Sequence, residues 1–317
     1  LDTTMLERPA RRSLQHDYLE QWPSQSTGNQ TDAKLSFLAR NIDQLRYLTS
    51  FDVDTVYCDF QDIREYRDAV AIGRDAEFKL FLATPRIQKP GELGLFKSIE
   101  KNCPDGILVR NLSGIEYFKE KFPLVADFSL NATNQITVEM IRSMGVELIT
   151  PSYDLNRDQL EMLVNHCDSK HLQIVIHQHM PMFHMEHCVF CSVLSPGTDK
   201  TNCGRPCDFH QVELRDRTGA LHPLHADVGC RNTLFNSQAQ SAAEMVTDLL
   251  RLGVSHFRVE LLRESTPAQV EHLFQQYQGL IHGALSGTQV WKTLNAMNRV
   301  GVTRGTLEHD RNPLAIL

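Results

Sequence analysis

A short apolar run followed by a polar turn and an amphipathic segment recurs along most of this 317-residue chain. The apolar runs are rich in β-branched and aromatic residues, and most intervals between them can hold one helix. Such alternation predicts parallel strands joined by crossover helices, and eight strands are the number that closes a TIM-like (β/α)8 barrel. The eight strands are expected at residues 35–39, 55–58, 79–83, 106–109, 124–128, 147–150, 172–176 and 256–261.

Helices are expected between these strands, at residues 41–48, 63–72, 92–101, 114–121, 138–144 and 158–166. A last helix is expected at 267–281, with Thr266 as its N-cap and Pro267 in its first turn. An open, doubly wound sheet would show the same alternation. However, no glycine-rich dinucleotide fingerprint follows the first strand, so the barrel is the preferred α/β architecture.

The stretch from His177 to about Ala242 interrupts this rhythm between the seventh and eighth strands. An unstructured loop of that length is uncommon in a compact domain. We therefore expect a folded, cysteine-rich insertion at residues 178–242, within a barrel that spans residues 33–285. A polar segment at residues 1–32 precedes the barrel, and a tail at residues 286–317 follows it.

Cysteines supply a means of stabilising the insertion, because five of the eight in the chain lie there. Clustered cysteines in a reducing compartment indicate a metal site before they indicate disulfides. Zinc and a [4Fe-4S] cluster both accept four thiolates, and the many nearby histidines would also suit zinc. The candidate ligands, of which four would be used, are Cys188, Cys191, Cys203, Cys207 and Cys230.

Charge and hydropathy limit the class of protein. The net charge of −7 argues against a broadly basic nucleic-acid-binding surface. No run of 18 apolar residues is present, and residues 1–32 lack the apolar core of a secretion signal. We therefore expect a cytoplasmic protein without a membrane span, and Leu1 in place of Met indicates a processed, trimmed or partial chain.

Polar residues follow the predicted strands at the end where barrel enzymes carry out their chemistry. Arg40, Arg86 and Arg110 follow three different strands, and their guanidinium groups could bind the carboxylate or phosphate of an anionic ligand. Asn131 and Asn134 follow the fifth strand and could bind a polar edge of a substrate. Asn134 could equally cap the next helix.

Four residues near the predicted strand ends are candidates for acid–base catalysis. Asp127 lies at the end of the fifth strand, and Glu260 at the end of the eighth. His177 and His179 alternate after the seventh strand, so both should point to one side. Each of these residues could instead cap a helix or face solvent.

The cysteine region resembles peptidase family U32. The resemblance is most specific from His179 to Asn236, and the segments SLNATNQ (Ser129–Gln135) and TPSYDLN (Thr150–Asn156) also resemble family segments, so that it spans roughly residues 33–285. It implies a barrel that carries an oxygen-sensitive [4Fe-4S] cluster. The chain departs from the family pattern in the narrow spacing of Cys188 and Cys191 and in the short interval to Cys203, which leaves open which four cysteines bind iron.

The resemblance also implies alternative activities. The family name records a collagenase-like protease, whereas better understood relatives hydroxylate tRNA, ribosomal RNA or ubiquinone precursors without molecular oxygen, some with prephenate as the source of the hydroxyl group. It thus implies an iron-sulfur hydroxylase that acts on an RNA base or on an aromatic or quinone precursor. The implied ligand is a small anionic or aromatic substrate or RNA, and the implied partner is a subunit of the same family. The alternatives are a peptidase, for which no HExxH or GxSxG motif is present, and a non-catalytic barrel with a structural zinc or iron-sulfur site.

Overall fold

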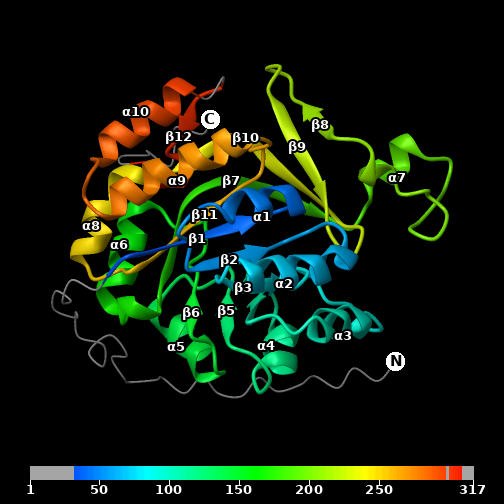
Figure 1. Ribbon diagram of the computed structural model, residues 1–317, viewed down its shortest axis with the longest axis horizontal. Helices are drawn as coiled ribbons and strands as arrows, with labels where there is room; N and C mark the ends of the chain where they lie inside the picture. Colours follow the sequence, from blue (N-terminus) through cyan, green and yellow to red (C-terminus); the bar gives the residue numbers. More distant parts are fainter. Residues whose placement is uncertain (1–31, 298–299, 309–317) are drawn as a thin grey trace, which may run out of the picture.

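The computed structural model describes residues 32–297 and 300–308. Eleven of its strands form one curled, mixed sheet in the order β6-β5-β4-β3-β2-β1-β11-β7-β10-β9-β8, and β12 pairs beside β10 (Figure 1). Apart from Asp32, the predicted N-terminal segment 1–32 lies outside the described residues. Residues 309–317 of the predicted tail also lie outside them.

Eight parallel strands form the curled part of the sheet. They are β1 (Lys34–Ala39), β2 (Thr55–Cys58), β3 (Lys79–Ala83), β4 (Gly106–Val109), β5 (Leu124–Ala126), β6 (Leu148–Ile149), β7 (Gln173–Met185) and β11 (His256–Glu260). A single parallel bridge, between Ile149 and Leu172, joins the β6 edge to the start of β7. The α/β fold and its curled sheet are therefore confirmed, but one bridge in place of a ladder does not establish the exact (β/α)8 closure.

Helices cover the outer face of this curled sheet (Figure 1). They are α1 (Ile42–Leu48), α2 (Tyr66–Asp75), α3 (Leu93–Lys101), α4 (Leu112–Phe118), α5 (Gln135–Ser143), α6 (Arg157–His166), α8 (Val246–Arg251) and α9 (Pro267–Ile281). Asparagine side chains cap α1, α4, α5 and α6, and Thr266 caps α9 as predicted. None of the described helices is long and apolar enough to cross a membrane.

The short strands are buried on both faces. Phe37 and Val56 belong to the large apolar core between the sheet and its helices, whereas their neighbours Leu38 and Tyr57 belong to a smaller core inside the curled sheet. This alternation follows from the two-residue period of a strand. Burial on both faces explains why these strands appear in the sequence as continuous apolar runs.

The predicted insertion extends the same sheet. Strand β7 continues past Ile176 to Met185, and β10 (Asn232–Ser241), β9 (Leu221–Ala226) and β8 (Val212–Arg215) add to it as antiparallel strands. The expected end of the seventh strand at residue 176 is therefore wrong. Proline is unfavourable within a paired strand, but Pro181 lies where the register between β7 and β10 shifts.

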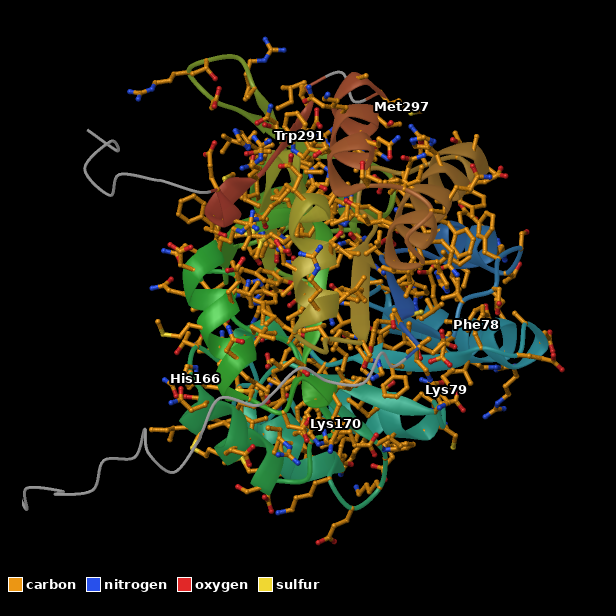
Figure 2. The ribbon with its side chains drawn as sticks, turned by 90° about the vertical axis from the view of Figure 1, so that its left-hand side faces the viewer. Phe78, Lys79, His166, Lys170, Trp291 and Met297 are labelled. Atoms are coloured by element: carbon orange, nitrogen blue, oxygen red, sulfur yellow. The ribbon has the colours of Figure 1, made fainter. Side chains whose placement is uncertain are left out.

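Residues 287–297 and 300–308 pack against β10 and the turn that follows it. Helix α10 (Gly287–Met297) approaches so closely that a Cβ on Gly287 would lie 2.3 Å from the Ala243 carbonyl oxygen. Strand β12 (Val302–Thr303) pairs with β10, and the Thr306 hydroxyl donates to the Tyr153 carbonyl at 3.1 Å. Figure 2 shows Trp291 and Met297 of α10 at the end of the molecule away from Lys79, which begins β3.

Replacing Gly106 by alanine should destabilise the fold. A Cβ on Gly106 would lie 2.1 Å from Cε1 of the buried Phe81 ring, so the ring or the strand must move. We expect a loss of about 1–3 kcal/mol in the free energy of unfolding, measured by urea denaturation. The control is Gly94→Ala in α3, where no atom lies within 4 Å of the new methyl group, and it should be neutral or slightly stabilising. Equal effects of the two substitutions would contradict this packing.

Candidate functional site

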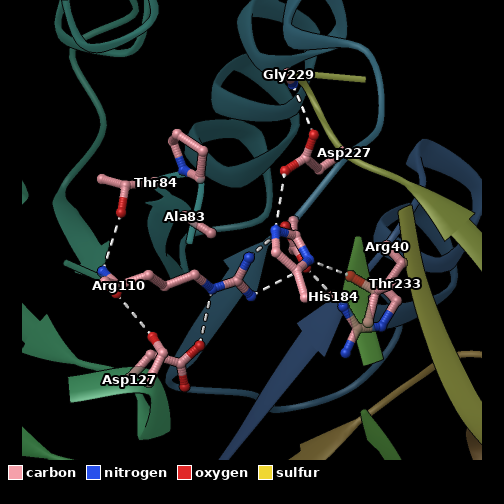
Figure 3. Close-up of polar contacts among 12 residues, drawn as sticks. Arg40, Ala83, Thr84, Arg110, Asp127, His184, Asp227, Gly229 and Thr233 are labelled. Carbon is pink, nitrogen blue, oxygen red and sulfur yellow. Dashed lines mark hydrogen bonds and ion pairs between the residues drawn. The ribbon is translucent and has the colours of Figure 1, made fainter. Parts of the chain in front are cut away.

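Six charged side chains form a closed ring of ion pairs at the carboxyl ends of the parallel strands. Each guanidinium group contacts the carboxylates on both sides of it, with N–O distances from 2.6 to 3.0 Å. Figure 3 shows the part of the ring where Arg110 meets Asp127. Three positive and three negative charges therefore neutralise one another. In order, the ring consists of Arg40, Asp59, Arg110, Asp127, Arg258 and Glu260.

The ring keeps Asp59 and Asp127 ionised although they are buried. Burial alone would raise the pKa of Asp59, but Arg110 and Arg40 lower it to about 2. The pKa of Asp127 is also lowered, because Arg258 and Arg110 outweigh the effect of burial. Each of these two carboxylates is thus paired with two arginines. Glu260 is also paired with two arginines, and it accepts a hydrogen bond from Tyr153 at 2.9 Å. The structure therefore places the predicted acid–base candidates Asp127 and Glu260 in a salt-bridge network.

A cleft above this ring contains all three arginines that were expected to bind an anion. Arg40 and Arg110 already bind carboxylates, whereas Arg86 makes no ion pair or hydrogen bond with any described residue. The Arg86 guanidinium lies 4.8 Å from the centre of the Phe128 ring, which stacks on Tyr153 in turn. Burial and the nearby Arg110 lower the pKa of Arg86. Within the described residues, Arg86 is the cation of this cleft that remains available to an anionic ligand.

Aromatic and imidazole rings make up much of the remaining cleft wall. The cleft is narrow and partly open to solvent. Phe235 lies beneath the Arg40 guanidinium at 4.7 Å, and burial lowers the pKa of His225 to about 4, so this imidazole is neutral at pH 7. The cleft therefore presents aromatic and imidazole rings beside a single free cation.

Two buried polar atoms face each other across one side of the cleft. His184 Nε2 and Asp227 Oδ2 lie 3.9 Å apart, too far for a hydrogen bond, and neither has another partner in the described chain (Figure 3). His184 Nδ1 lies 2.8 Å from the Thr233 hydroxyl, which fixes the ring. Burial raises the pKa of Asp227 to about 6 and lowers that of His184 to about 4.

The five cysteines of the 178–242 region line one large cavity next to this cleft. All five are free thiols, and Ala226 and Asp227 line both the cavity and the cleft. The Cys191 amide approaches Cys188 Sγ at 3.5 Å. Behind them, Phe190 of α7 (Val189–Leu194) packs with residues of β9 and β10 in a separate small apolar core. Several unpaired thiols around one space are a donor set that suits a thiolate-bound cluster. Within the described residues, however, no three His, Cys, Asp or Glu side chains are placed to hold a single metal ion.

The remaining predicted residues lie away from the cleft. Asn134 caps α5 by accepting a hydrogen bond from the Thr137 amide, which is the alternative role expected for it. Asn131 is exposed, with a left-handed backbone (φ 55°). Neither asparagine therefore lines the cleft that contains Arg40, Arg86 and Arg110.

His177 and His179 point the same way, as expected, but into a different cavity. This cavity lies beside α9 and also contains Glu264 and His272. His177 Nδ1 lies 3.1 Å from the Tyr277 hydroxyl, and burial lowers the pKa of His177 to about 4. The structure therefore does not combine these histidines with Asp127 and Glu260 in one site.

The sequence matches peptidase family U32 over residues 41–308, which is most of the chain. This protein belongs to peptidase family U32. No curated protein matches the sequence. The structure of the U32 peptidase Mk0906 has a TM-score of 0.40 and 13% identity, covering 50% of this chain and 74% of that one.

Other solved structures are similar to this U32 protein at the same low level. Thiamine phosphate pyrophosphorylase from Pyrococcus furiosus has a TM-score of 0.42 and 10% identity, covering 80% of this chain and 98% of that one. A putative dihydrodipicolinate synthase family protein from Coccidioides immitis has a TM-score of 0.44 and 9% identity, covering 85% and 80%. Likeness at this level carries no information about function.

Sequence reasoning missed Arg258, His184 and Asp227 as residues of the U32 strand-end site. Arg258 lies inside β11 and was outside a search limited to strand ends. Its signal was the alternation of His256, Arg258 and Glu260, which places polar groups on one face of a strand. His184 and Asp227 carried no comparable signal, because the extension of β7 that positions His184 was not predicted.

Acid should weaken the fold of this U32 protein through Asp59. Its pKa falls from 3.8 to about 2 on folding, so its stabilising contribution is complete above about pH 4 and is lost as the pH falls towards 2. Asp59→Asn should lower stability at pH 7 by about 3–5 kcal/mol and flatten the pH dependence between pH 4 and 2, measured by urea denaturation. Asp43→Asn, in an exposed pair with Arg46, should change neither. An unchanged pH profile for Asp59→Asn would contradict this role.

Proposed function

We propose that this U32 protein is an iron-sulfur enzyme that hydroxylates an aromatic ring or a nucleobase without molecular oxygen. The observation that carries the proposal is a cavity lined by five free thiols that shares a wall with a cleft containing one available cation. Four of Cys188, Cys191, Cys203, Cys207 and Cys230 would hold a [4Fe-4S] cluster. Unpaired thiols in this number also suit the reducing conditions of the cytoplasm.

The proposed chemistry needs a redox group close to the substrate. Replacing a C–H bond by a C–O bond oxidises the substrate by two electrons, so the donor that gives up its hydroxyl group must itself take the electron pair and the proton. A bound cluster would supply a centre that passes these electrons one at a time. The other tasks fall to the chain itself. Arg86 binds the anionic group of substrate or donor, Phe128 and Phe235 contact a flat ring, and Asp227 separates the ligand from the cysteines.

The charge distribution favours a small anionic or aromatic ligand over a long nucleic acid. Because the ring neutralises Arg40 and Arg110, the cleft holds one net positive site at Arg86 instead of three. Two basic residues next to the cysteines are also paired, Arg205 with Asp62 and Arg231 with Glu92. A single guanidinium over an aromatic ring suits one carboxylate, so Arg86 would pair with one of the two carboxylates of a hydroxyl donor such as prephenate.

Anaerobic purification should yield a brown protein that contains iron and sulfide. Serine substitution of each of the five cysteines in turn should abolish the colour in four variants and spare it in one, because the cluster takes four ligands. Cys103→Ser, at an exposed cysteine remote in sequence from the five, should keep the full iron content. The measurements are metal analysis and electron paramagnetic resonance. A colourless protein with stoichiometric zinc would contradict the proposal, and gelatin cleavage that persists after iron removal would support the peptidase alternative.

Replacing Arg86 by methionine should weaken binding of a simple aromatic carboxylate. Benzoate is a suitable probe, and its dissociation constant, measured by calorimetry, should rise by about 10- to 100-fold, because a charge-assisted hydrogen bond is lost. Arg46→Met removes an exposed arginine of α1 and serves as the control. Equal benzoate affinity in the wild type and Arg86→Met would remove the anion site from the proposal.

A further inference from the structure

The wall between the cysteine cavity and the cleft contains polar atoms that the fold leaves without partners. His184 Nε2 and Asp227 Oδ2 are buried and 3.9 Å apart, and the exposed fractions of their side chains are 8% and 16%. A buried donor or acceptor without a hydrogen bond costs free energy, so such atoms call for a partner. At this separation one oxygen atom can lie within hydrogen-bond distance of both, once the side chains that now cover the two atoms move aside for it.

Asp227 is fixed in place by its other carboxylate oxygen. Oδ1 accepts hydrogen bonds from the Gly229 amide at 2.8 Å and the Arg231 amide at 2.9 Å. These bonds close the turn that carries Cys230, whose backbone is left-handed (φ 62°). Oδ1 therefore has a structural task, whereas Oδ2 takes no part in the turn and faces His184.

The imidazole opposite is held just as firmly. His184 lies on β7, where Thr233 of β10 contacts its Nδ1 at 2.8 Å and is paired with it across the two strands. Its Nε2 is consequently directed at Asp227, and the ring cannot turn away without breaking this contact. Arg86 lines the same cleft. Burial is the largest cause that lowers the pKa of His184, and the charge of Arg86 is the next largest.

We propose that His184 and Asp227 bind a neutral hydroxyl group of the ligand whose anionic end pairs with Arg86. The inference rests on the proposed anion site at Arg86 and adds a second recognition point, so that the ligand is a hydroxylated carboxylate. A hydroxyl group suits the pair because it donates one hydrogen bond and accepts another. The ligand hydroxyl then contacts Asp227, which lines both the cleft and the cysteine cavity.

Calorimetry with matched probes tests the proposal. The probes are benzoate, 3-hydroxybenzoate and 4-hydroxybenzoate, titrated into protein whose iron content has been measured. At least one hydroxybenzoate should bind the wild type about tenfold or more tightly than benzoate, because benzoate leaves the two buried atoms unpaired. Equal affinity for all three probes would overturn the proposal and leave these atoms as a site for bound water only.

Asp227→Asn is the decisive variant, because its amide oxygen can still close the Cys230 turn while the acceptor that faces His184 is lost. We expect the preference for the hydroxybenzoate over benzoate to disappear. His184→Phe keeps a planar ring, lies outside the turn and should have the same effect. If the preference survives both substitutions, the assignment is wrong.

The matched control is Asp216→Asn. Asp216 also closes a turn through Oδ1, with the amides of Thr218 and Ala220, and also lies near a histidine, but it is in the β8–β9 hairpin away from the cleft. It should leave all three affinities unchanged. Arg86→Met should weaken every probe by the same factor, so failure of the anion site is distinguished from failure of the hydroxyl site.

Discussion

The closed ring of three arginines and three acids is the interaction on which the rest of the site depends. Its members come from β11 and from the ends of β1, β2, β4 and β5. Backbone hydrogen bonds join each of these strands only to its immediate neighbours in the sheet, whereas the ring connects all five strands. A buried charge is tolerated only when it is paired. Each member therefore restrains its two neighbours, and the strand ends cannot move apart independently.

This ring also decides which groups remain available for chemistry. Counting charged residues at the strand ends suggests a strongly cationic mouth, but most of these charges are used to satisfy one another. Arg86 is available because it stacks on Phe128 and meets no carboxylate among the described residues. For the anionic ligand proposed above, selectivity would consequently depend on one cation and on the neutral groups around it, instead of on an overall positive field.

The sequence predicted the strands of the curled sheet well and the site only in part. β2, β3 and β4 begin and end where their apolar runs do, because burial on both faces leaves an unambiguous pattern. The extension of β7 was missed because its polar residues and Pro181 obscure a strand that antiparallel pairing with β10 stabilises. The pairing of Asp59 with both Arg40 and Arg110 depends on contacts between distant residues, which periodicity in one sequence does not reveal.

The small apolar core behind the cysteines has a consequence for how this protein matures. Phe190, Leu224 and Leu234 give the cysteine segment its own packing, and β9 and β10 connect it to the main sheet by backbone hydrogen bonds. The cysteine segment can therefore fold without a bound cluster. For the cluster proposed above, a folded apoprotein would already have its five thiols around one cavity, so that synthesis of the chain and insertion of the cluster would be separate events in time.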